Sequence, residues 1–371
     1  MPVMKLLAVN WRDLKNPEAG GAEVHLQEIL TRMAGRGHQV TLFAAGYPGG
    51  PAEETCAGIR VIRRGNWYNA NYVLPFAIRA HLKNNSYDLI IEDINKIPCF
   101  LPLFVKQKVL AVIPHLFGAT VFRETNPLLA SYVYLWEKFI PRVYRASRFV
   151  AISPSTREDL IQRGIKAERI DVSLCGLDHQ TFRRLEGVRR FDEPTLIHFG
   201  RIRKYKGIDT VIKAFAGIRE AVPNARLIIA GDGPDRAELE ALTTRMNLNR
   251  SIDFLGMVPI DKLIELLNKC HLFLNASAKE GWGLTVVEAN ACGMPVIASN
   301  RPGLKDSVKH EKTGYLVEYG RPAAFAARAV ELLSDQAKWQ AMSEAALDWA
   351  RSLTWDRNAD EMEKIFLEEV S

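Results

Sequence analysis

Short apolar runs alternate with longer amphipathic stretches along the whole chain, and this alternation most restricts its fold. Short apolar runs between polar loops are typical of buried strands, and apolar residues at helical spacing indicate helices that cover a sheet. Their alternation predicts an α/β fold with parallel sheets covered on both faces. Strands are expected at 5–10, 39–44, 89–92, 109–113, 149–153, 196–200, 225–230, 252–255, 272–275 and 295–298. Helices are expected at 22–36, 155–163, 208–220, 236–246 and 259–269.

The chain is long enough for more than one hydrophobic core. It has 371 residues, and domains usually contain on the order of 100–200. The alternation fades over the charged stretch 182–194 and then restarts with a strong strand. We therefore expect two Rossmann-like domains, at 1–182 and 195–352, and a last, charged helix within 353–371.

Positive charge is concentrated in the first half of the chain. Residues 1–180 contain 22 Lys and Arg against 16 Asp and Glu, whereas residues 181–371 contain 27 of each. The formal excess of +6 therefore lies entirely before residue 181. Either it is a solvated basic face, or it attracts an acidic partner such as an anionic membrane surface.

The cysteines and the N-terminus bear on the compartment. The five cysteines are scattered and form no Cys-x-x-Cys pair, which argues against a disulfide framework or a zinc site and fits a reducing compartment. The N-terminal apolar run is too short for a signal peptide, and no apolar run is long enough to cross a membrane. We expect a cytoplasmic protein.

A basic loop follows the expected strand 196–200. The segment 200–207, GRIRKYKG, lies between that strand and a helix, where ligands bind in open α/β sheets. Arg201 offers a planar guanidinium that can fork onto phosphate oxygens, and Lys206 adds a second cation. A solvated basic loop is the alternative interpretation.

The most informative segment is 277–295, SAKEGWGLTVVEANACGMP. Glu280 lies in a loop, and Glu288 lies just over one turn inside a helix expected to begin near Leu284. One carboxylate can accept both hydroxyls of a ribose, and the other can contact a sugar hydroxyl. Acid–base catalysis by the two glutamates is a competing interpretation that this spacing suits less well. The backbone N–H groups between them can hold phosphate or sugar oxygens, which adds Gly281, Trp282, Gly283, Leu284 and Thr285 as candidates.

The first half of the chain offers weaker candidates. Gly20 and Gly21 follow the first expected strand and open a helix, so their backbone can approach an anion closely. A flexible loop with a glycine cap is the alternative. His115 follows another strand and suits a structural role as well as a functional one. Asp93 and Asn95 end a third strand and are candidates on the acceptor side.

Several motifs are missing from the sequence. It has no Walker loop, no Gly-x-Gly-x-x-Gly after its first strand and no metal-ligand spacing of His and Cys. No Asp-x-Asp pair follows a strand, so we expect neither a metal ion nor another cofactor. Cationic side chains and helix termini would neutralise a diphosphate instead.

These segments together resemble glycosyltransferase family 4, whose members are retaining, nucleotide-sugar-dependent enzymes of the GT-B fold. EGWGLTVVEANACGMPVIAS is similar to the family's Glu-x7-Glu signature, and GRIRKYKG resembles its diphosphate-binding segment. AGDGPDRAELE, FLGMV and GLKDSVKHEKTGYLV resemble other donor-domain blocks, and PEAGGAEVHLQEI resembles the N-terminal glycine loop. The resemblance implies two Rossmann-like domains facing a central cleft, with the C-terminal helix packed back on the N-terminal domain. SLCGLD departs from the pattern, because Cys175 stands where the family usually has Asn.

The resemblance also implies roles for single residues. Arg201 and Lys206 would bind the donor diphosphate. Glu288 would bind the ribose and Glu280 the donor sugar. The remaining matches are Gly20 and Gly21 at the phosphates, Met257 and Val258 near the base, and His115 near the transferred sugar.

We therefore predict transfer of a hexose-type sugar from a UDP- or GDP-sugar to an acceptor hydroxyl, with retention at the anomeric carbon. The expected acceptor is a lipid-linked or cell-surface glycan precursor. A soluble acceptor and a non-catalytic nucleotide-sugar-binding protein are the alternatives. Nucleic-acid binding is disfavoured, because no such motif appears and the C-terminal half is neutral.

A last expectation concerns the helical segment 122–148. Its aromatic and basic residues predict peripheral contact with the inner face of a membrane, with aromatics at the headgroups and arginines against anionic lipid. Alternatively, the aromatics fill the domain core. The residues are Phe122, Tyr132, Tyr134, Trp136, Phe139 and Tyr144, with Arg142, Arg145 and Arg148.

Overall fold

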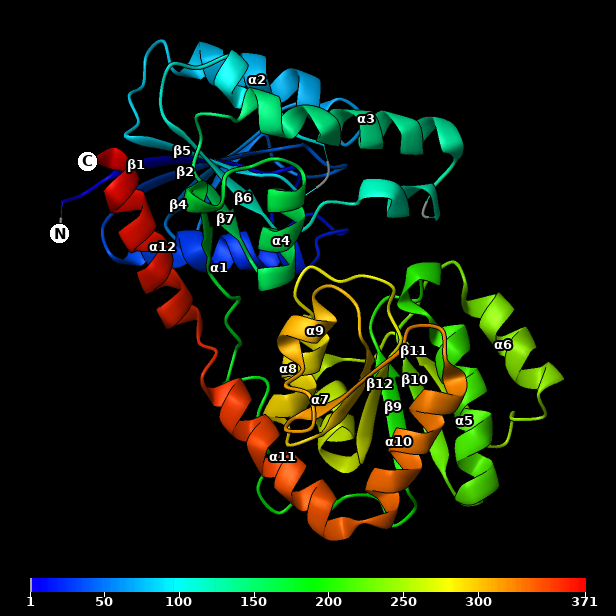
Figure 1. Cartoon of the computed structure of the whole chain (residues 1–371). Helices are drawn as coiled ribbons and strands as arrows, with labels where there is room; N and C mark the ends of the chain where they lie inside the picture. The colour runs from blue at the N-terminus through cyan, green and yellow to red at the C-terminus, as the bar shows by residue number, and fades with distance from the viewer. Residues whose placement is uncertain (1, 96, 124) are drawn as a thin grey trace. The chain divides into compact units, whose positions relative to one another are not determined.

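The structure, a computed structural model, describes residues 2–95, 97–123 and 125–371 (Figure 1). The chain forms two compact units. Unit 1 comprises Met1–Gly176 and Trp355–Ser371, and unit 2 comprises Leu177–Thr354. In the described part of the chain, no helix combines the length and the apolar character that a membrane span requires.

Unit 1 is built around a mixed sheet in the order β3-β4-β2-β1-β5-β6-β7-β8. β3 pairs antiparallel with β4, and the other neighbouring strands pair in parallel. The chain builds outward in opposite directions from the central pair β1 and β5. The strands are β1 (Lys5–Val9), β2 (Gln39–Ala44), β3 (Glu53–Cys56), β4 (Ile59–Arg63), β5 (Leu89–Asp93), β6 (Val109–Ile113), β7 (Phe149–Ala151) and β8 (Ile170–Val172).

Helices cover both faces of this sheet. On one face, Leu30 of α1 and Phe366 of α12 lie in the same apolar core. On the other face, Leu74 of α2, Ile140 of α3 and Leu160 of α4 share a second core. The helices are α1 (Gly21–Gly35), α2 (Ala70–His81), α3 (Pro127–Val143), α4 (Pro154–Gln162) and α12 (Trp355–Val370), with short turns η1 (Leu101–Leu103), η2 (Gly118–Arg123) and η3 (Ala167–Arg169).

The C-terminal helix α12 packs on unit 1, as the family resemblance implied. Its apolar side joins the core above α1, and its polar side contacts polar residues that follow that helix. Arg36 Nη2 lies 2.5 Å from Asp360 Oδ1, and His38 Nε2 lies 2.9 Å from Glu363 Oε1. Residues more than three hundred positions apart in sequence therefore complete one domain.

Unit 2 contains a parallel sheet in the order β11-β10-β9-β12-β13-β14. This is the doubly wound Rossmann order, in which the first strand lies beside the fourth. Apolar cores lie on both faces, one with α5, α6 and α10 and one with α7, α8 and α9. The strands are β9 (Thr195–Phe199), β10 (Arg226–Ala230), β11 (Ile252–Gly256), β12 (Leu272–Asn275), β13 (Val296–Ser299) and β14 (Gly314–Val317). The helices are α5 (Ile208–Ala221), α6 (Arg236–Arg245), α7 (Ile260–Lys269), α8 (Leu284–Ala291), α9 (Leu304–Ser307), α10 (Pro322–Ser334) and α11 (Gln336–Arg351), with the turn η4 (Lys204–Lys206).

The α/β prediction is confirmed, and each expected strand and helix is present to within two residues. The apolar runs in the sequence did not predict β3, β4, β8 or β14. β3 and β8 are too short and too polar to form such a run, and β4 is interrupted by arginines.

The charged stretch 182–194 lies within unit 2. Leu185 N donates to Asn268 Oδ1 at 2.8 Å, and Arg190 Nη2 donates to Gly293 O at 2.7 Å. The Arg190 guanidinium also lies over the Trp339 ring, 4.6 Å from its centroid. The stretch is therefore attached to unit 2 by polar contacts, of which those of Arg190 reach backbone carbonyls.

The structure corrects two residues of the segment 122–148. Tyr144 is fully buried and packs on Phe149, so it belongs to the core. Arg148 Nε lies 2.5 Å from Asp171 Oδ2, and Arg148 Nη2 lies 2.8 Å from Glu368 Oε2, so this arginine is an internal brace of unit 1.

Candidate functional site

The strand order of unit 2 changes direction between β9 and β12, which are neighbours in the sheet. The loops that leave the carboxyl ends of such a pair diverge and open a crevice for ligand. The basic loop 200–207 follows β9, and the glutamate loop 276–283 follows β12. The segments 200–207 and 277–295 of the sequence therefore meet at the switch point of one sheet.

Close backbone contact locks these two loops together. Gly207 has φ +65°, and a Cβ on it would lie 2.3 Å from Ala276 O, so only glycine fits. Two residues before Gly207, the carbonyl oxygen of Tyr205 accepts a hydrogen bond from Ala278 N at 2.7 Å. Lys206 lies between these two contacts and is held by them.

A third loop, which follows β13, holds the glutamate loop from its other side. Glu280 N donates to Pro302 O at 3.0 Å, and Arg301 Nε donates to Ala278 O at 2.9 Å. Gly303 has φ +82°, and a Cβ there would lie 2.3 Å from Glu280 O. The backbone on both sides of Glu280 is therefore fixed before any ligand arrives.

Lys206 and Glu280 form an ion pair inside this arrangement. Lys206 Nζ lies 2.7 Å from Glu280 Oε1, and the two side chains are only 13% and 14% exposed. Burial lowers the pKa of Lys206, but attraction to Glu280 outweighs burial and leaves that pKa above its usual value. The lysine is therefore a stable cation at the place where a diphosphate is expected.

Glu288 lies in the second turn of α8, next to the same lysine. Burial raises the pKa of Glu288 to about 7, and the Lys206 ammonium opposes this rise. Below it in β9, burial lowers the pKa of His198 to about 4, so this imidazole is neutral at neutral pH. Near neutral pH, Lys206 stays charged and His198 stays neutral, so Glu288 is the group of this cluster whose charge changes with pH.

The remaining donor-side candidates surround this cluster. Arg201 is exposed at the start of the basic loop. Met257 follows β11 and is 76% exposed, an unusual position for a large apolar side chain, whereas Val258 packs partly on the core. An exposed thioether of this kind offers an apolar surface to a flat ring.

The backbone between the two glutamates leads directly into α8. Gly283 has φ +93° and caps the helix, and a Cβ on it would lie 2.8 Å from Ser307 Oγ. Leu284 and Thr285 begin the helix, so their N–H groups have no intrahelical acceptor. Trp282 is 2% exposed and packs against Trp349, so its side chain anchors the loop and only its backbone, like that of Gly281, can face a ligand.

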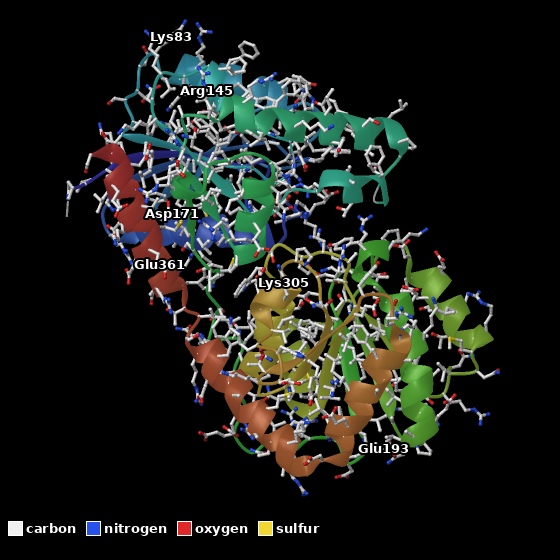
Figure 2. The ribbon with its side chains drawn as sticks, viewed as in Figure 1. Lys83, Arg145, Asp171, Glu193, Lys305 and Glu361 are labelled. Carbon is white, nitrogen blue, oxygen red and sulfur yellow. The ribbon has the colours of Figure 1, made fainter. Side chains whose placement is uncertain are left out.

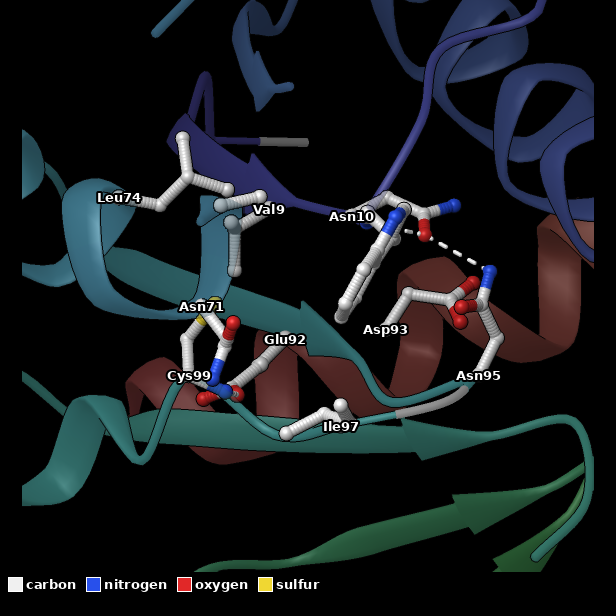
Figure 3. Close-up of a pocket in the computed structure, with 11 residues that line it drawn as sticks. Val9, Asn10, Asn71, Leu74, Glu92, Asp93, Asn95, Ile97 and Cys99 are labelled. Carbon is white, nitrogen blue, oxygen red and sulfur yellow. Dashed lines mark hydrogen bonds between the residues drawn. The ribbon is translucent and has the colours of Figure 1, made fainter. Parts of the chain in front are cut away.

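In unit 1, Asp93 and Asn95 lie beside Asn10 at the carboxyl ends of β5 and β1 (Figure 3). Asn95 Nδ2 donates to Asn10 Oδ1 at 2.9 Å and to Glu23 Oε1 at 3.2 Å. Glu23 Oε2 accepts from Gly20 N at 2.7 Å. The Glu23 carboxylate therefore already accepts from the N–H of Gly20. An incoming phosphate would have to displace this carboxylate or accept from the N–H of Gly21.

His115 follows the neighbouring strand β6, and its ring lies edge-on to Phe117. The buried carboxylate of Glu137 holds this loop, because it accepts from Phe117 N at 2.6 Å and from Gly118 N at 2.8 Å. Arg163 Nη1 lies 3.3 Å from the same carboxylate. The two groups of candidates, around Lys206 and around Asp93, belong to different units.

Sequence reasoning missed several residues that shape these sites. Asn10, Glu23 and Glu137 carry no motif, because each acts through contacts with distant segments. Arg301 and Gly303 follow a predicted strand directly, and that position could have identified them. In the described part of the chain, no three His, Cys, Asp or Glu side chains are grouped so as to hold a metal ion.

Two family models together span most of the chain. The model described as Glycosyltransferase Family 4 matches residues 19–181, and the one described as Glycosyl transferases group 1 matches residues 182–349. The chain belongs to glycosyltransferase family 4. This family-4 glycosyltransferase is 28% identical over 368 residues to a GDP-mannose-dependent α-(1-6)-phosphatidylinositol monomannoside mannosyltransferase of Mycobacterium tuberculosis, with 92% of each chain covered.

Solved structures agree with the fold. A sucrose-phosphate synthase of Thermosynechococcus elongatus superposes with a TM-score of 0.82 at 21% identity, covering 98% of both chains. The Anabaena protein HepE, solved with UDP-glucose, superposes with a TM-score of 0.77 at 20% identity, covering 98% of this chain and all of its own. The family-4 glycosyltransferase therefore has the GT-B fold.

The first prediction concerns Arg201 and Lys206, two of the four cations of the basic loop. Lys206→Ala should lower turnover of a sugar nucleotide about 100-fold with the fold intact, and Arg201→Ala should lower it too, because each cation would stabilise a departing diphosphate. Nucleotide release measures the effect. Lys213→Ala is the control, since Lys213 pairs with Asp209 on the exposed side of α5. Turnover near that of the wild type in both loop variants would remove them from the mechanism.

The second prediction concerns Glu288. The hydroxyls of a ribose donate to a carboxylate better than to a carboxyl group, so nucleoside diphosphate affinity should rise as the pH passes upward through about 7. Calorimetric titrations across this range measure it. Glu288→Gln should bind more weakly and lack the rise that the wild type shows beyond titration of the phosphate itself. An identical pH profile in both proteins would contradict the assignment.

Proposed function

We propose that this family-4 glycosyltransferase transfers a hexose-type sugar from a UDP- or GDP-sugar to an acceptor hydroxyl, with retention at the anomeric carbon and without a metal ion. The observation that carries the proposal is the cluster of Lys206, Glu280 and Glu288 at the switch point of unit 2. It combines a buried cation with two carboxylates, of which Glu280 is paired with that cation and Glu288 has a raised pKa. Two similar proteins support this donor class, since the mycobacterial mannosyltransferase is GDP-mannose-dependent and HepE was solved with UDP-glucose.

Each member of the cluster suits one part of such a donor. Lys206 and Arg201 would take the diphosphate, and the N–H groups at the start of α8 would add partial positive charge. Glu288 would accept from the ribose, and the exposed Met257 would lie against the base. Glu280 is bound to Lys206, so a sugar hydroxyl held by Glu280 would lie next to the bond that breaks. The electrostatic part of this site is assembled before the donor binds, which reduces the reorganisation needed for reaction.

Alternative functions use the same cluster of residues. A non-catalytic sensor would bind the nucleotide sugar without releasing nucleoside diphosphate, and a transferase with a soluble acceptor would need no membrane. We propose instead an acceptor that is a lipid-linked or cell-surface glycan precursor, reached by peripheral contact with a membrane. The support for this contact lies on the surface of unit 1.

The helices α2 and α3 lie side by side (Figure 1), and exposed aromatic and leucine side chains on them and on the neighbouring turns form what we call the aromatic surface. Asn71 Nδ2 of α2 donates to Tyr132 Oη of α3 at 2.9 Å, so the two helices adjoin, and Phe76 of α2 packs edge-on against Phe104, which follows η1. Leu128 is 86% exposed and Phe76 is 61% exposed. Apolar patches of this kind on soluble proteins mark interaction sites. The aromatic surface consists of Trp67, Tyr68, Tyr72, Phe76, Leu103, Phe122, Leu128, Leu129, Leu135 and Phe139.

The charges around the aromatic surface are basic. Within α2 and α3 the single carboxylate is Glu137, which is buried and occupied by backbone N–H groups. Figure 2 shows Lys83 and Arg145 beside these helices, Asp171 near α12 and Glu361 on α12. Aromatic side chains with basic neighbours suit the headgroup layer of an anionic bilayer. The exposed cations are Arg79, Lys83, Lys138, Arg142 and Arg145.

The third prediction tests the function and its independence of metal. The protein should release nucleoside diphosphate from a UDP- or GDP-sugar in the presence of excess EDTA, because cationic side chains take the place of a metal. Loss of activity that Mn²⁺ or Mg²⁺ restores would contradict the cationic clamp. Thermal-shift titrations with UDP-, GDP- and ADP-sugars identify the donor, since a ligand that binds only the folded state raises stability. Binding without nucleotide release would favour the sensor.

The fourth prediction tests membrane contact. The protein should bind vesicles of phosphatidylglycerol and phosphatidylcholine at low salt and dissociate as salt rises, because exposed charges are screened within about 8 Å at physiological ionic strength. Co-sedimentation measures binding. Arg142→Ser with Arg145→Ser should weaken it, as should Phe76→Ser with Phe139→Ser. Arg245→Ser with Arg250→Ser changes exposed arginines of unit 2 and is the control. Absence of binding at low salt would favour the soluble acceptor.

A further inference from the structure

The switch point of unit 1 repeats the topology of the donor site with different chemistry. β1 and β5 are neighbours, and the strands that follow them build outward in opposite directions. Asn10 follows β1 directly, Asp93 ends β5, and Asn95 lies two residues beyond it. By the rule that places ligands at such points, this edge is a second position where a ligand is expected.

Buried polar atoms without partners lie at this point. Asn10, Asp93 and Asn95 are 2%, 5% and 6% exposed. Within the described residues, Asn10 Nδ2, Asn95 Oδ1 and both carboxyl oxygens of Asp93 have no hydrogen-bond partner. Buried polar groups are nearly always paired in folded proteins, and exceptions are concentrated at functional sites. Four such atoms in one cluster need a common explanation.

The hydrogen bonds around the cluster determine which atoms stay free. Asn10 Oδ1 accepts from Trp11 N at 2.6 Å and from Asn95 Nδ2 at 2.9 Å. Asn95 Nδ2 also donates to Glu23 Oε1 at 3.2 Å. If either amide were turned over, two donors or two acceptors would face each other, so both orientations follow from their partners. One free donor, Asn10 Nδ2, and several free acceptors are therefore real features of the site.

The space at the cluster is small. A cavity of about 10 Å³ is lined by Asn10, Asp93 and Asn95 together with Trp11, Asn71 and Glu92 (Figure 3). Such a volume holds about one water molecule or one hydroxyl group, and neither a phosphate nor a ring fits inside it. A ligand would insert a hydroxyl here while the rest of it lay outside.

The charge around the cluster selects the kind of group. Burial raises the pKa of Asp93 well above its usual range, and the negative charge of Glu23 raises it further. A phosphate or carboxylate would meet two acidic side chains. A cation would match the acceptors but would face the amide donor of Asn10. A hydroxyl both donates and accepts, so it can bind an acidic side chain and Asn10 Nδ2 at once.

We propose that Asn10, Asp93 and Asn95 form a hydroxyl-binding subsite for the acceptor, and that the acceptor presents a neutral polyol or sugar ring to unit 1. This inference rests on the proposed function for its meaning, although the subsite lies within one unit and can be tested alone. Any anionic group of the acceptor, such as the phosphate of a lipid-linked precursor, lies away from Asp93.

Binding of neutral rings tests the subsite directly. The probes are myo-inositol, methyl α-D-glucopyranoside and methyl α-D-mannopyranoside, measured by saturation-transfer NMR and by calorimetry. Wild-type protein should bind at least one probe. Asp93→Leu should weaken that binding at least about tenfold, because it removes both acceptors and fills the cavity. Asp93→Asn, which keeps one acceptor, should fall between the two.

Controls separate the subsite from folding and from the proposed function. Asp88→Asn makes a change at the exposed amino end of the same strand and should leave probe binding unchanged. Nucleoside diphosphate affinity should be equal in all variants, and an unchanged thermal unfolding transition shows that unit 1 keeps its fold. The subsite is overturned if no probe binds the wild type, or if Asp93→Leu binds as tightly as the wild type. Failure of sugar-nucleotide turnover in the wild type would overturn the proposed function instead.

Discussion

Parallel pairing brings the carboxyl ends of β9 and β12 to one edge of the sheet in unit 2, and the geometry of the candidate donor site follows from that edge. The two loops leave the sheet side by side and touch through backbone atoms, because Gly207 carries no Cβ, and the loop after β13 approaches the glutamate loop equally closely at Gly303. The contact fixes Lys206 opposite Glu280. A side chain at either glycine would part the loops and separate the ion pair, so the electrostatics of the site depend on van der Waals contact.

The ion pair itself shows why the loops must be rigid. Two charges that are almost removed from water cost free energy unless their geometry is good. Here, Glu280 N is held by Pro302 O and Lys206 by its neighbours on both sides, so little conformational entropy is lost when the pair forms. The pair keeps Lys206 charged but does not use all of its donors, because an ammonium has three N–H donors and Glu280 accepts from one of them.

The local sequence pattern predicted the strands, the helices and the positions of the loops that follow them. It could do so because a buried strand or an amphipathic helix depends on residues that are close together in the sequence. It did not predict how side chains from distant segments meet. Tyr144 and Arg148 continued a helical surface pattern, yet one packs on Phe149 and the other braces α12 through Glu368. Trp282 lies in the most recognisable motif, but its ring serves the core. The pairing of Lys206 with Glu280 joins segments 74 residues apart and also required the fold.

The two switch points differ in charge although their topology is the same. In unit 2, the loop after the first strand supplies Arg201 and Lys206, and the carboxylate opposite is already paired with the lysine. In unit 1, the corresponding residues are Asn10 and Asp93, and the charge acting on Asp93 is another carboxylate. An anion is therefore favoured at one edge and opposed at the other. A diphosphate and a neutral hydroxyl are the two kinds of group that glycosyl transfer must handle, and each edge is suited to one of them.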